Sequence, residues 1–492
     1  MFLRRQDIRK LLSILFVVLL PCSLMSQVRT GNIWGSLFEK SDYAARRMQF
    51  MQKISDGIAV IRGATRAPGG FGFDQNNDFF YFTGVAIPDA VLIMDGTRRE
   101  SLLFFTLTEK EAEGEGIPLE LVRKPEEVTG IERILARDRF SSYLFYLSGL
   151  SMQPGVFYAK FWPEELGRVS GSGAEFNFLY GAEFNFLQKS MTLEPWDGRL
   201  TPELQFVKQL KEKFPQVTIK DCSSLIWNLR KIKSPSEIEA MRIAGQIAVK
   251  AHKAVMQSTR PEINERELAA LFEYVCKKEG ADLAYGIEML SGKNHEYGRF
   301  NGGYDRVLKN GDFLILDGGA DYCHYKVDFS TSFPANGKFT PRQKELYELA
   351  YAVRDICLRT YRPGITLADV GKKVEEFLVK RGIDLSDPAY LLLKNVAVRW
   401  GGYNHPVGMT VHDVMGSMSG PEEVLKPGFV FACDIMIPRP AEEMGIRLED
   451  TVVITKDGCE VLAAGLPRTV EEIEAFMDKA GMIQILKKAD RY

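Results

Sequence analysis

Apolar runs of strand length alternate with helical stretches through residues 38–215. GIAVIRG, DAVLIMDG and SLLFFTL are runs of this kind, and helical stretches separate them. This alternation is typical of a small α/β domain, so we predict an N-terminal domain over residues 38–215. Within it, GAEFNFL occurs twice, at residues 173–179 and 181–187. Two copies are too few for a solenoid, and this local duplication predicts no function.

The second part of the chain, residues 222–492, begins with a strongly helical pattern. Ser234 and Pro235 have the residue types of a helix cap and of a first helical position. Beyond these helices the pattern predicts a strand-rich block over residues 311–334, a helix in RQKELYELAYAVRDICLRTY, further strands and a last helix in VEEIEAFMDKAG. We therefore predict a second, larger domain of the α/β (α+β) class.

The N-terminus has a third pattern, in which basic residues precede the apolar run LLSILFVVLL. MFLRRQDIRK supplies the positive charge, and PCSLMSQ follows the run. A helix that spans a bilayer needs roughly 20 apolar residues, so this shorter run favours a cleaved secretory signal. We predict a signal peptide at residues 1–26, cleavage near Ser26, and an exported protein, periplasmic or secreted, without membrane attachment after cleavage.

Two other interpretations of this segment stay open. Cys22 is a candidate for lipid attachment, although Pro21 stands where a small residue usually precedes such a cysteine. Arg4 and Arg5 are a candidate twin-arginine signal, although QDI follows where an apolar pair is usual. Plain Sec export fits the segment better than either.

Composition limits the partners of the protein. The 492 residues are 45% hydrophobic and 26% charged, the balance of a soluble globular protein. The formal net charge of -2 gives no long-range field that would attract nucleic acid or an anionic membrane, so neither is a predicted partner. The six cysteines after Cys22 form no CxxC pair, so we predict neither a zinc knuckle nor a disulfide framework.

Four carboxylates and one histidine stand out, because four of the five lie in or beside apolar runs of strand length. They are Asp317 in FLILDGG, Asp328 in YKVDFST, His405 in NHPVG, Asp434 in FACDIMI and Glu449 in GIRLEDTVVIT. Taken alone, each aspartate is more often a turn former or a salt-bridge partner. A group of buried carboxylates, however, is costly unless its members are paired or bind a metal.

Asp317 and Asp328 bracket the sequence GGADYCHYKV, which reads as a hairpin connection. We therefore predict that the two carboxylates lie opposite each other across an antiparallel pair of strands. Like charges at that distance repel, and a divalent cation between them reverses the sign of the interaction. The pattern indicates a metal site.

These segments resemble a known family, the pita-bread metallopeptidases, which include aminopeptidase P, prolidase and methionine aminopeptidase, with creatinase as a metal-free relative. LDGGADYCHYKVDFSTSFPANGKFTPRQKELYELA is similar to the family segment with two metal-binding aspartates, and HPVGMTVHD to its histidine segment. KPGFVFACDIMI and GIRLEDTVVIT resemble its last two carboxylate segments, and NDFFYFTGVAIPDAVLIM its N-terminal creatinase-type domain. That domain is absent from methionine aminopeptidase, so the resemblance implies peptide substrates with proline in the second position.

The resemblance implies a metal-binding role for each of the five residues. Asp317 would bind one metal ion, and His405 and Asp434 would bind the other. Asp328 and Glu449 would bridge the two ions. An oxygen-rich set with one imidazole favours Mn²⁺, with Zn²⁺ or Co²⁺ as substitutes.

The resemblance also implies catalytic roles. His412 would contact the peptide, Arg447 would orient a carboxylate ligand from behind, and Glu449 or a neighbour would act as general base. Two cations held roughly 3.5 to 4 Å apart lower the pKa of a shared water and polarise the scissile carbonyl.

Three positions depart from the family pattern. The family's first active-site histidine should fall near Arg299 or Phe300, and His295 on the same predicted loop is the candidate to replace it as a substrate-binding residue. A second family histidine corresponds to Gly401. Asp434 stands where the family has glutamate, and the missing methylene shortens its reach by about 1 Å, a displacement that can cost roughly a hundredfold in rate.

Two functions from different classes follow. The first is an exported metallo-aminopeptidase that acts on Xaa-Pro peptides, with Xaa-Pro dipeptidase as a close variant. The second is a catalytically silent relative that binds a peptide or a partner protein. Creatinase-like hydrolysis without metal is disfavoured, because a metal-free enzyme has no reason to retain five ligand-type residues. A homo-oligomer is also left open, because relatives often form dimers or tetramers.

Overall fold

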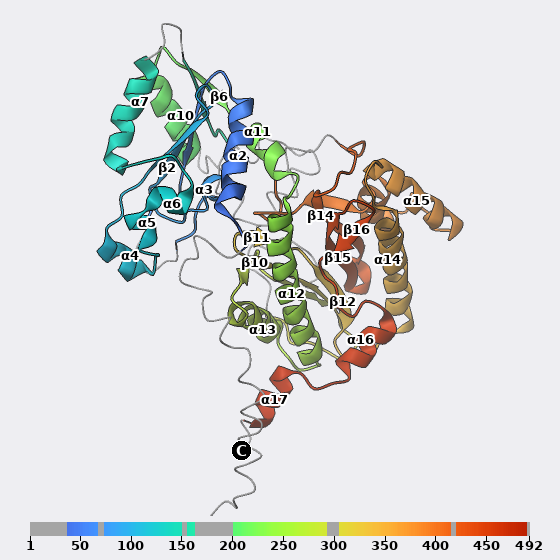
Figure 1. Cartoon of the computed structure of the whole chain (residues 1–492). Coiled ribbons are helices and arrows are strands. Elements are labelled where there is room, and N and C mark those ends of the chain that lie inside the picture. The colour runs from blue at the N-terminus through green and yellow to red at the C-terminus, as the bar shows by residue number, and fades with distance from the viewer. Residues whose placement is uncertain are drawn as a thin grey trace, which may run out of the picture.

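The computed structural model describes residues 37–66, 73–149, 155–162, 200–292, 305–414 and 420–489. The predicted signal peptide, the duplicated GAEFNFL segment, His295, Arg299 and Phe300 lie outside these residues. The described chain forms two domains, with the N-terminal one at the upper left of Figure 1. Within the described residues, no helix has the length and apolar character required to cross a bilayer.

The N-terminal domain contains a six-stranded mixed sheet in the order β4-β3-β2-β1-β5-β6. The last of these strands lies beyond residue 215 and pairs in parallel with β5, so the sheet continues past the predicted limit of the domain. The strands are β1 (Ile58–Arg62), β2 (Val91–Asp95), β3 (Glu100–Phe104), β4 (Arg133–Leu135), β5 (Val156–Ala159) and β6 (Thr218–Asp221).

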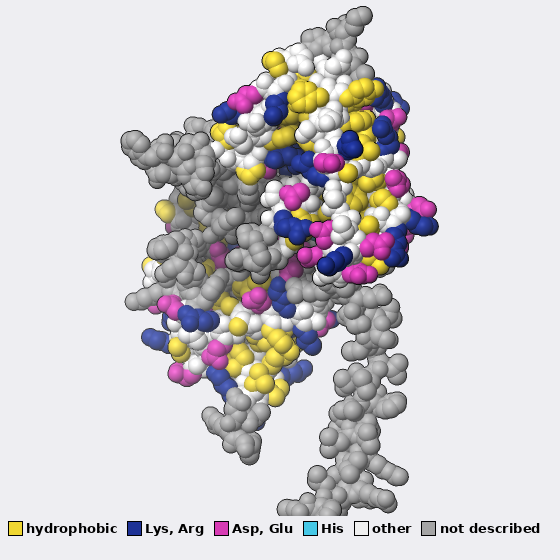
Figure 2. All heavy atoms as spheres, turned by 90° about the vertical axis from the view of Figure 1, so that its left-hand side faces the viewer, with side chains coloured by type: hydrophobic (Ala, Val, Ile, Leu, Met, Phe, Trp, Pro, Cys, Tyr) yellow, Lys and Arg dark blue, Asp and Glu magenta, His cyan; other side chains and the backbone are white. Residues whose placement is uncertain are grey.

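Alternating side chains of this sheet pack on helices from two sides. Val60 faces a small core shared with α7 and α10, whereas Ala59 and Ile61 join the large core that continues into the C-terminal domain. The helices here are α2 (Lys40–Lys53), α3 (Asn77–Thr83), α4 (Glu109–Glu115), α5 (Glu120–Arg123), α6 (Pro125–Thr129), α7 (Phe140–Gly149), α10 (Pro202–Lys213) and α11 (Ser223–Arg230). On the face shown in Figure 2, basic and acidic side chains are interspersed with apolar ones.

The C-terminal domain is built around a curved antiparallel sheet in the order β13-β14-β15-β12-β9-β8, with β16 paired to β15. A small sheet, β11-β10-β7, lies beside it. The strands are β7 (Asp282–Leu283), β8 (Glu288–Ser291), β9 (Phe313–Asp317), β10 (Ala320–Tyr322), β11 (Tyr325–Lys326), β12 (Ser330–Pro334), β13 (Tyr403–Pro406), β14 (Val430–Arg439), β15 (Met444–Ile454) and β16 (Cys459–Val461).

Helices α12 to α16 surround this sheet (Figure 1). The predicted cap is confirmed, because the Ser234 hydroxyl accepts a hydrogen bond from the backbone of Glu237 and Pro235 begins α12. The last predicted helix ends at Met477, earlier than expected, and α17 follows it. The helices are α12 (Pro235–Ser258), α13 (Glu265–Lys278), α14 (Pro341–Thr360), α15 (Leu367–Lys380), α16 (Val470–Met477) and α17 (Met482–Ala489).

The predicted register of the hairpin is wrong by two residues. Asp317 lies opposite Ser330 in the β9–β12 ladder, and Asp328 is displaced by two residues towards the turn. The cause is the tip of the hairpin, where Cys323 and His324 both adopt positive φ, +53° and +67°, and so centre the two-residue turn between them. The two carboxylates are therefore diagonal neighbours on one face of the sheet.

Candidate metal centre

A row of polar side chains crosses the centre of the curved sheet. Asp317 on β9 pairs with Ser330 on β12, which pairs in turn with Glu449 on β15. Glu449 also pairs with Asp434 on β14. Because paired residues of antiparallel strands point to the same face, the three carboxylates converge from three strands. All three are buried.

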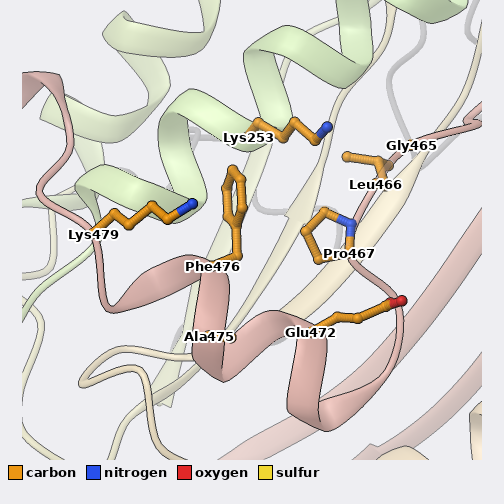
Figure 3. A pocket seen from close by; sticks show the side chains of 8 residues that line it. All are labelled: Lys253, Gly465, Leu466, Pro467, Glu472, Ala475, Phe476 and Lys479. Atoms are coloured by element: carbon orange, nitrogen blue, oxygen red, sulfur yellow. The ribbon is translucent and has the colours of Figure 1, made fainter.

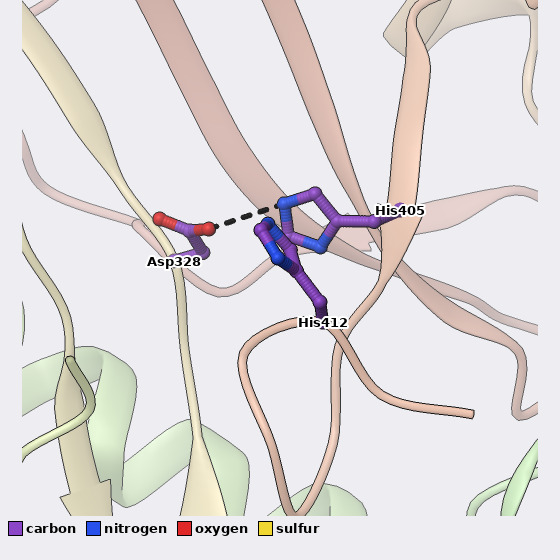
Figure 4. Close-up of side chains that lie close together, drawn as sticks. All are labelled: Asp328, His405 and His412. Carbon is purple, nitrogen blue, oxygen red and sulfur yellow. Dashed lines mark ion pairs between the residues drawn. The ribbon is translucent and has the colours of Figure 1, made fainter. Parts of the chain in front are cut away.

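The ring of His405, from β13, closes one side of this row. Its Nε2 atom lies 3.3 Å from Oδ2 of Asp328 (Figure 4) and 3.7 Å from Oε1 of Glu449. Its Nδ1 atom lies 3.2 Å from the carbonyl oxygen of Pro406. If Nδ1 donates its hydrogen to that carbonyl, the Nε2 lone pair faces the carboxylates, as a metal ligand requires.

His412 lies on the loop after β13, with its ring centroid 3.8 Å from that of His405 (Figure 4). Ligand atoms of Asp328, His405 and His412 all lie within 4.8 Å of one another, and a second group of this kind contains Asp317, Asp328 and Glu449. Asp328 belongs to both groups, which is the place expected of a bridging ligand. Asp434 belongs to neither.

Burial and mutual repulsion raise the pKa values of these carboxyl groups. Burial, and next the negative charge of Asp317, raise the pKa of Asp328 to about 8. Burial also raises the pKa of Asp434 to about 7 against the opposing charge of Arg447. The pKa of Glu449 is raised chiefly by burial. A metal-free centre would thus retain protons near neutral pH.

These pKa values predict that the metal-free protein loses stability as the pH rises. An acid whose folded pKa is raised binds more protons folded than unfolded, so the free energy of unfolding falls between about pH 4 and pH 8. We expect urea midpoints of chelator-treated protein to be lower at pH 8 than at pH 5. Saturating Mn²⁺ should remove this difference and release protons on binding. Equal midpoints in chelator at both pH values would contradict the prediction.

Arg447 lies behind the carboxylates and pairs with three of them. Its guanidinium donates to Oδ2 of Asp317, and its Nη2 atom lies 2.9 Å from Oδ2 of Asp434 and 3.0 Å from Oε2 of Glu449. It therefore holds one oxygen of each carboxylate in place. This is the orienting role that the resemblance implies.

The residues present fit a divalent metal. Among the described residues, three buried atoms of the cluster make no hydrogen bond: Nε2 of His405, Oδ1 of Asp434 and Oε1 of Glu449. Buried polar atoms are almost always satisfied, so lone-pair atoms that accept no hydrogen bond, lying among like charges, indicate a cation. Oxygen atoms with one or two imidazoles suit Mn²⁺ or Zn²⁺.

Gly401 shows why a histidine is absent from that position. Its φ is +58°, and a Cβ atom there would lie 2.4 Å from the backbone oxygen of Leu367 at the start of α15. Its own carbonyl accepts a hydrogen bond of 2.6 Å from the hydroxyl of Tyr361. Helix α15 thus occupies the space that a side chain at position 401 would need.

We expect Gly401→His to destabilise the protein by about 2 to 4 kcal/mol and not to improve activity, because a side chain clashes with backbone. Gly382→Ala is the control, since Gly382 has a φ of +73° but open space around it. That variant should lose only about 1 kcal/mol. Chemical unfolding of both variants tests this, and equal losses would contradict the proposed clash.

Sequence reasoning missed several polar residues that support the cluster. The hydroxyl of Tyr285 donates to Oδ1 of both Asp317, at 2.6 Å, and Asp328. Ser330 donates to Oε2 of Glu449 at 2.8 Å. The spacing of Ser330 two residues after Asp328, which places both on one face of a strand, could have indicated Ser330, but nothing in the sequence around Tyr285 marks it. Asn404, which donates to Oδ2 of Asp434 at 2.9 Å, is marked by its place beside His405.

A separate cavity of about 450 Å³ lies between α12 and α16 (Figure 3). It is open, and none of the predicted site residues that the structure describes line it. Its lining residues are Lys253, Gly465, Leu466, Pro467, Glu472, Ala475, Phe476 and Lys479.

The fold and the cluster define a class of protein, the metallopeptidases with a curled antiparallel catalytic sheet. The model of metallopeptidase family M24 matches residues 239–456, and that of the aminopeptidase P N-terminal domain matches residues 43–147. Xaa-Pro aminopeptidase of Escherichia coli is 30% identical over 90% of this chain and 98% of its own. The chain belongs to metallopeptidase family M24 and, within it, to the Xaa-Pro aminopeptidase family.

Two further relatives agree with this assignment. Human Xaa-Pro aminopeptidase 3 is 25% identical over 92% of this chain and 89% of its own. The structure of zinc-substituted E. coli aminopeptidase P in complex with product has a TM-score of 0.67 and 27% identity, covering 90% of this chain and 98% of that one.

Proposed function

We propose that this protein is an exported aminopeptidase with two metal ions that releases the N-terminal residue from peptides with proline in the second position. One observation carries the proposal: two groups of ligand atoms share Asp328 inside a buried cluster. The full-length similarity to E. coli Xaa-Pro aminopeptidase supports the substrate class.

The residues of the cluster would serve three purposes in this reaction: metal binding, proton transfer and contact with the peptide. When bound, two divalent cations supply Lewis acidity and lower the pKa of a water. Asp317, Asp328, His405, Asp434 and Glu449 would hold them, and Mn²⁺ is our first choice. Oε1 of Glu449, the oxygen not held by Arg447 or Ser330, would face the metals, and Glu449 or a neighbour would act as general base. His412 is only half-buried and can meet the peptide at the edge of the cluster.

The test is release of free amino acid from matched tripeptides with added Mn²⁺. We expect Xaa-Pro-Xaa to be cleaved at least tenfold faster than Xaa-Ala-Xaa, and a chelator to abolish turnover. The dipeptide Xaa-Pro separates an aminopeptidase from a dipeptidase. Turnover no greater than that of Asp328→Ala would remove the proposal.

A catalytically silent relative is the second candidate, and Asp434 is the observation that favours it, because this shorter carboxylate belongs to neither group of ligand atoms. Arg447, which pairs with Asp317, Asp434 and Glu449, already offsets part of the negative charge that a metal would neutralise. The raised pKa values of Asp328 and Asp434 show that this compensation is incomplete. A silent protein would bind Mn²⁺ or peptide in calorimetry without hydrolysis.

Export is tested separately. The proposal predicts that the mature protein begins after Ser26 when it is produced with its own N-terminus. N-terminal sequencing of protein from a cell envelope fraction measures this. An intact Met1 in a cytosolic fraction would exclude a cleaved signal.

A further inference from the structure

One loop carries both histidines of the cluster. We call residues 405–413 the histidine loop, because His405 begins it and His412 lies next to its end. The backbone nitrogen of Asp413 donates to the carbonyl of Pro406 at 2.9 Å, which closes the loop. Its fixed shape therefore determines how the two imidazoles lie relative to the carboxylates.

Asp413 holds this loop from the inside. Its side chain is 1% exposed, its Oδ1 atom accepts from Nη2 of Arg230, and its Oδ2 atom lies 3.3 Å from Nζ of Lys233. A Cβ atom on Gly408 would lie 2.1 Å from Oδ2, so only glycine leaves room for this carboxylate. The end of the loop beside His412 is thus anchored on two buried cations, Arg230 and Lys233.

Arg230, the last residue of α11, connects this anchor to α3. Its Nη1 atom donates to Oδ1 of Asp78 at 2.6 Å, and Oδ2 of Asp78 lies 2.5 Å from Nζ of Lys160. Asp78 belongs to α3, and its side chain is 2% exposed. The neighbouring residue on α3, Asn77, donates from Nδ2 to the carbonyl oxygen of Met409 at 3.2 Å. The N-terminal domain therefore contacts the histidine loop at two points.

We propose that α3 of the N-terminal domain fixes the histidine loop, directly through Asn77 and through Arg230 as a positioning residue. Removing a partner of a buried ion is costly, and although Asp78 also contacts Lys160 and Asp413 also contacts Lys233, Arg230 is the cation that the two aspartates share. The alternation of negative, positive and negative groups gives the guanidinium one preferred place. The position of the loop thus depends on a domain that supplies none of the predicted ligands.

The effect on metal binding and catalysis rests on the proposed function, whereas the effect on the loop does not. Amide hydrogen exchange reports the loop directly. Asn77→Ala removes one neutral hydrogen bond to Met409, and we expect the loop amides to exchange at least tenfold faster. The matched control is Ser236→Ala, which removes another inter-domain hydrogen bond, 3.1 Å from Ser236 to Asp42, away from the loop. It should leave loop exchange unchanged within twofold.

Asp78→Asn tests the ionic contact, with Ser236→Ala again as the control. We expect Asp78→Asn to weaken Mn²⁺ binding and lower kcat per folded molecule by about tenfold, more than it changes KM. Ser236→Ala should leave both unchanged within twofold. Equal effects of both variants, or unchanged loop exchange in Asn77→Ala, would overturn the proposal. If the unmodified protein binds no Mn²⁺ but the exchange result holds, the proposed function fails and the coupling stands. If Asp78→Asn does not fold, Asn77→Ala decides.

Discussion

Asp328→Asn is expected to abolish peptide hydrolysis, by at least about a thousandfold in kcat, while making the metal-free protein more stable. Asp328 is shared by both groups of ligand atoms, so its loss removes a ligand from each. In the absence of metal, burial and Asp317 raise the pKa of Asp328 to about 8, so the neutral amide relieves repulsion. At pH 8 the gain in unfolding free energy should be at least about 1 kcal/mol.

The measurements are tripeptide turnover with Mn²⁺ and urea unfolding in chelator. Asp321→Asn is the control, because Asp321 lies on the same hairpin, pairs with Lys326, and belongs to neither group of ligand atoms. It should retain turnover. If Asp328→Asn kept its activity, Asp328 would not belong to a catalytic metal site. If it were less stable than the unmodified protein without metal at pH 8, the carboxylates would not repel one another.

The sequence identifies the carboxylates that come together in the candidate metal centre, but not the strand register and hydrogen bonds that position them. Asp317, Asp434 and Glu449 could be selected because each interrupts an apolar run, and a buried charge needs a compensating partner. The register of the hairpin could not be predicted, since nothing in GGADYCHYKV shows which two residues adopt positive φ. Tyr285 joins the cluster through tertiary contacts alone.

Helix α15 shows a different kind of miss. Thr366 and Asp369 form a capping box, and buried residues follow at Leu367, Val370 and Val374, so the local signal was present. Its consequence for the site was not visible, because only packing places this helix against Gly401. The absence of a histidine at position 401 follows from the packing of α15 on the turn that contains Gly401. A departure from a family pattern therefore cannot be taken as a loss of activity until the structure around it is known.

Of the proposed substitutions, Arg447→Met should lower the unfolding free energy of the metal-free protein most, by about 3 to 5 kcal/mol. Three buried carboxylates, Asp317, Asp434 and Glu449, lose their shared cation, whereas methionine fills much of the volume. The loss should be smaller at pH 5 than at pH 8, because protonation relieves the unpaired charges. Urea unfolding at both pH values measures it.

Mn²⁺ should raise the unfolding free energy of this variant more than that of the unmodified protein, because a divalent cation supplies the charge that Arg447 no longer provides. The control is Arg439→Met, which removes a buried arginine of the neighbouring strand β14 that donates to the carbonyl oxygens of Ala389 and Pro438 and not to the cluster. Mn²⁺ should stabilise that variant only as much as it stabilises the unmodified protein. If Mn²⁺ raised the unfolding free energy of Arg447→Met no further than that of Arg439→Met, then Arg447 and the metal would not be acting on the same carboxylates.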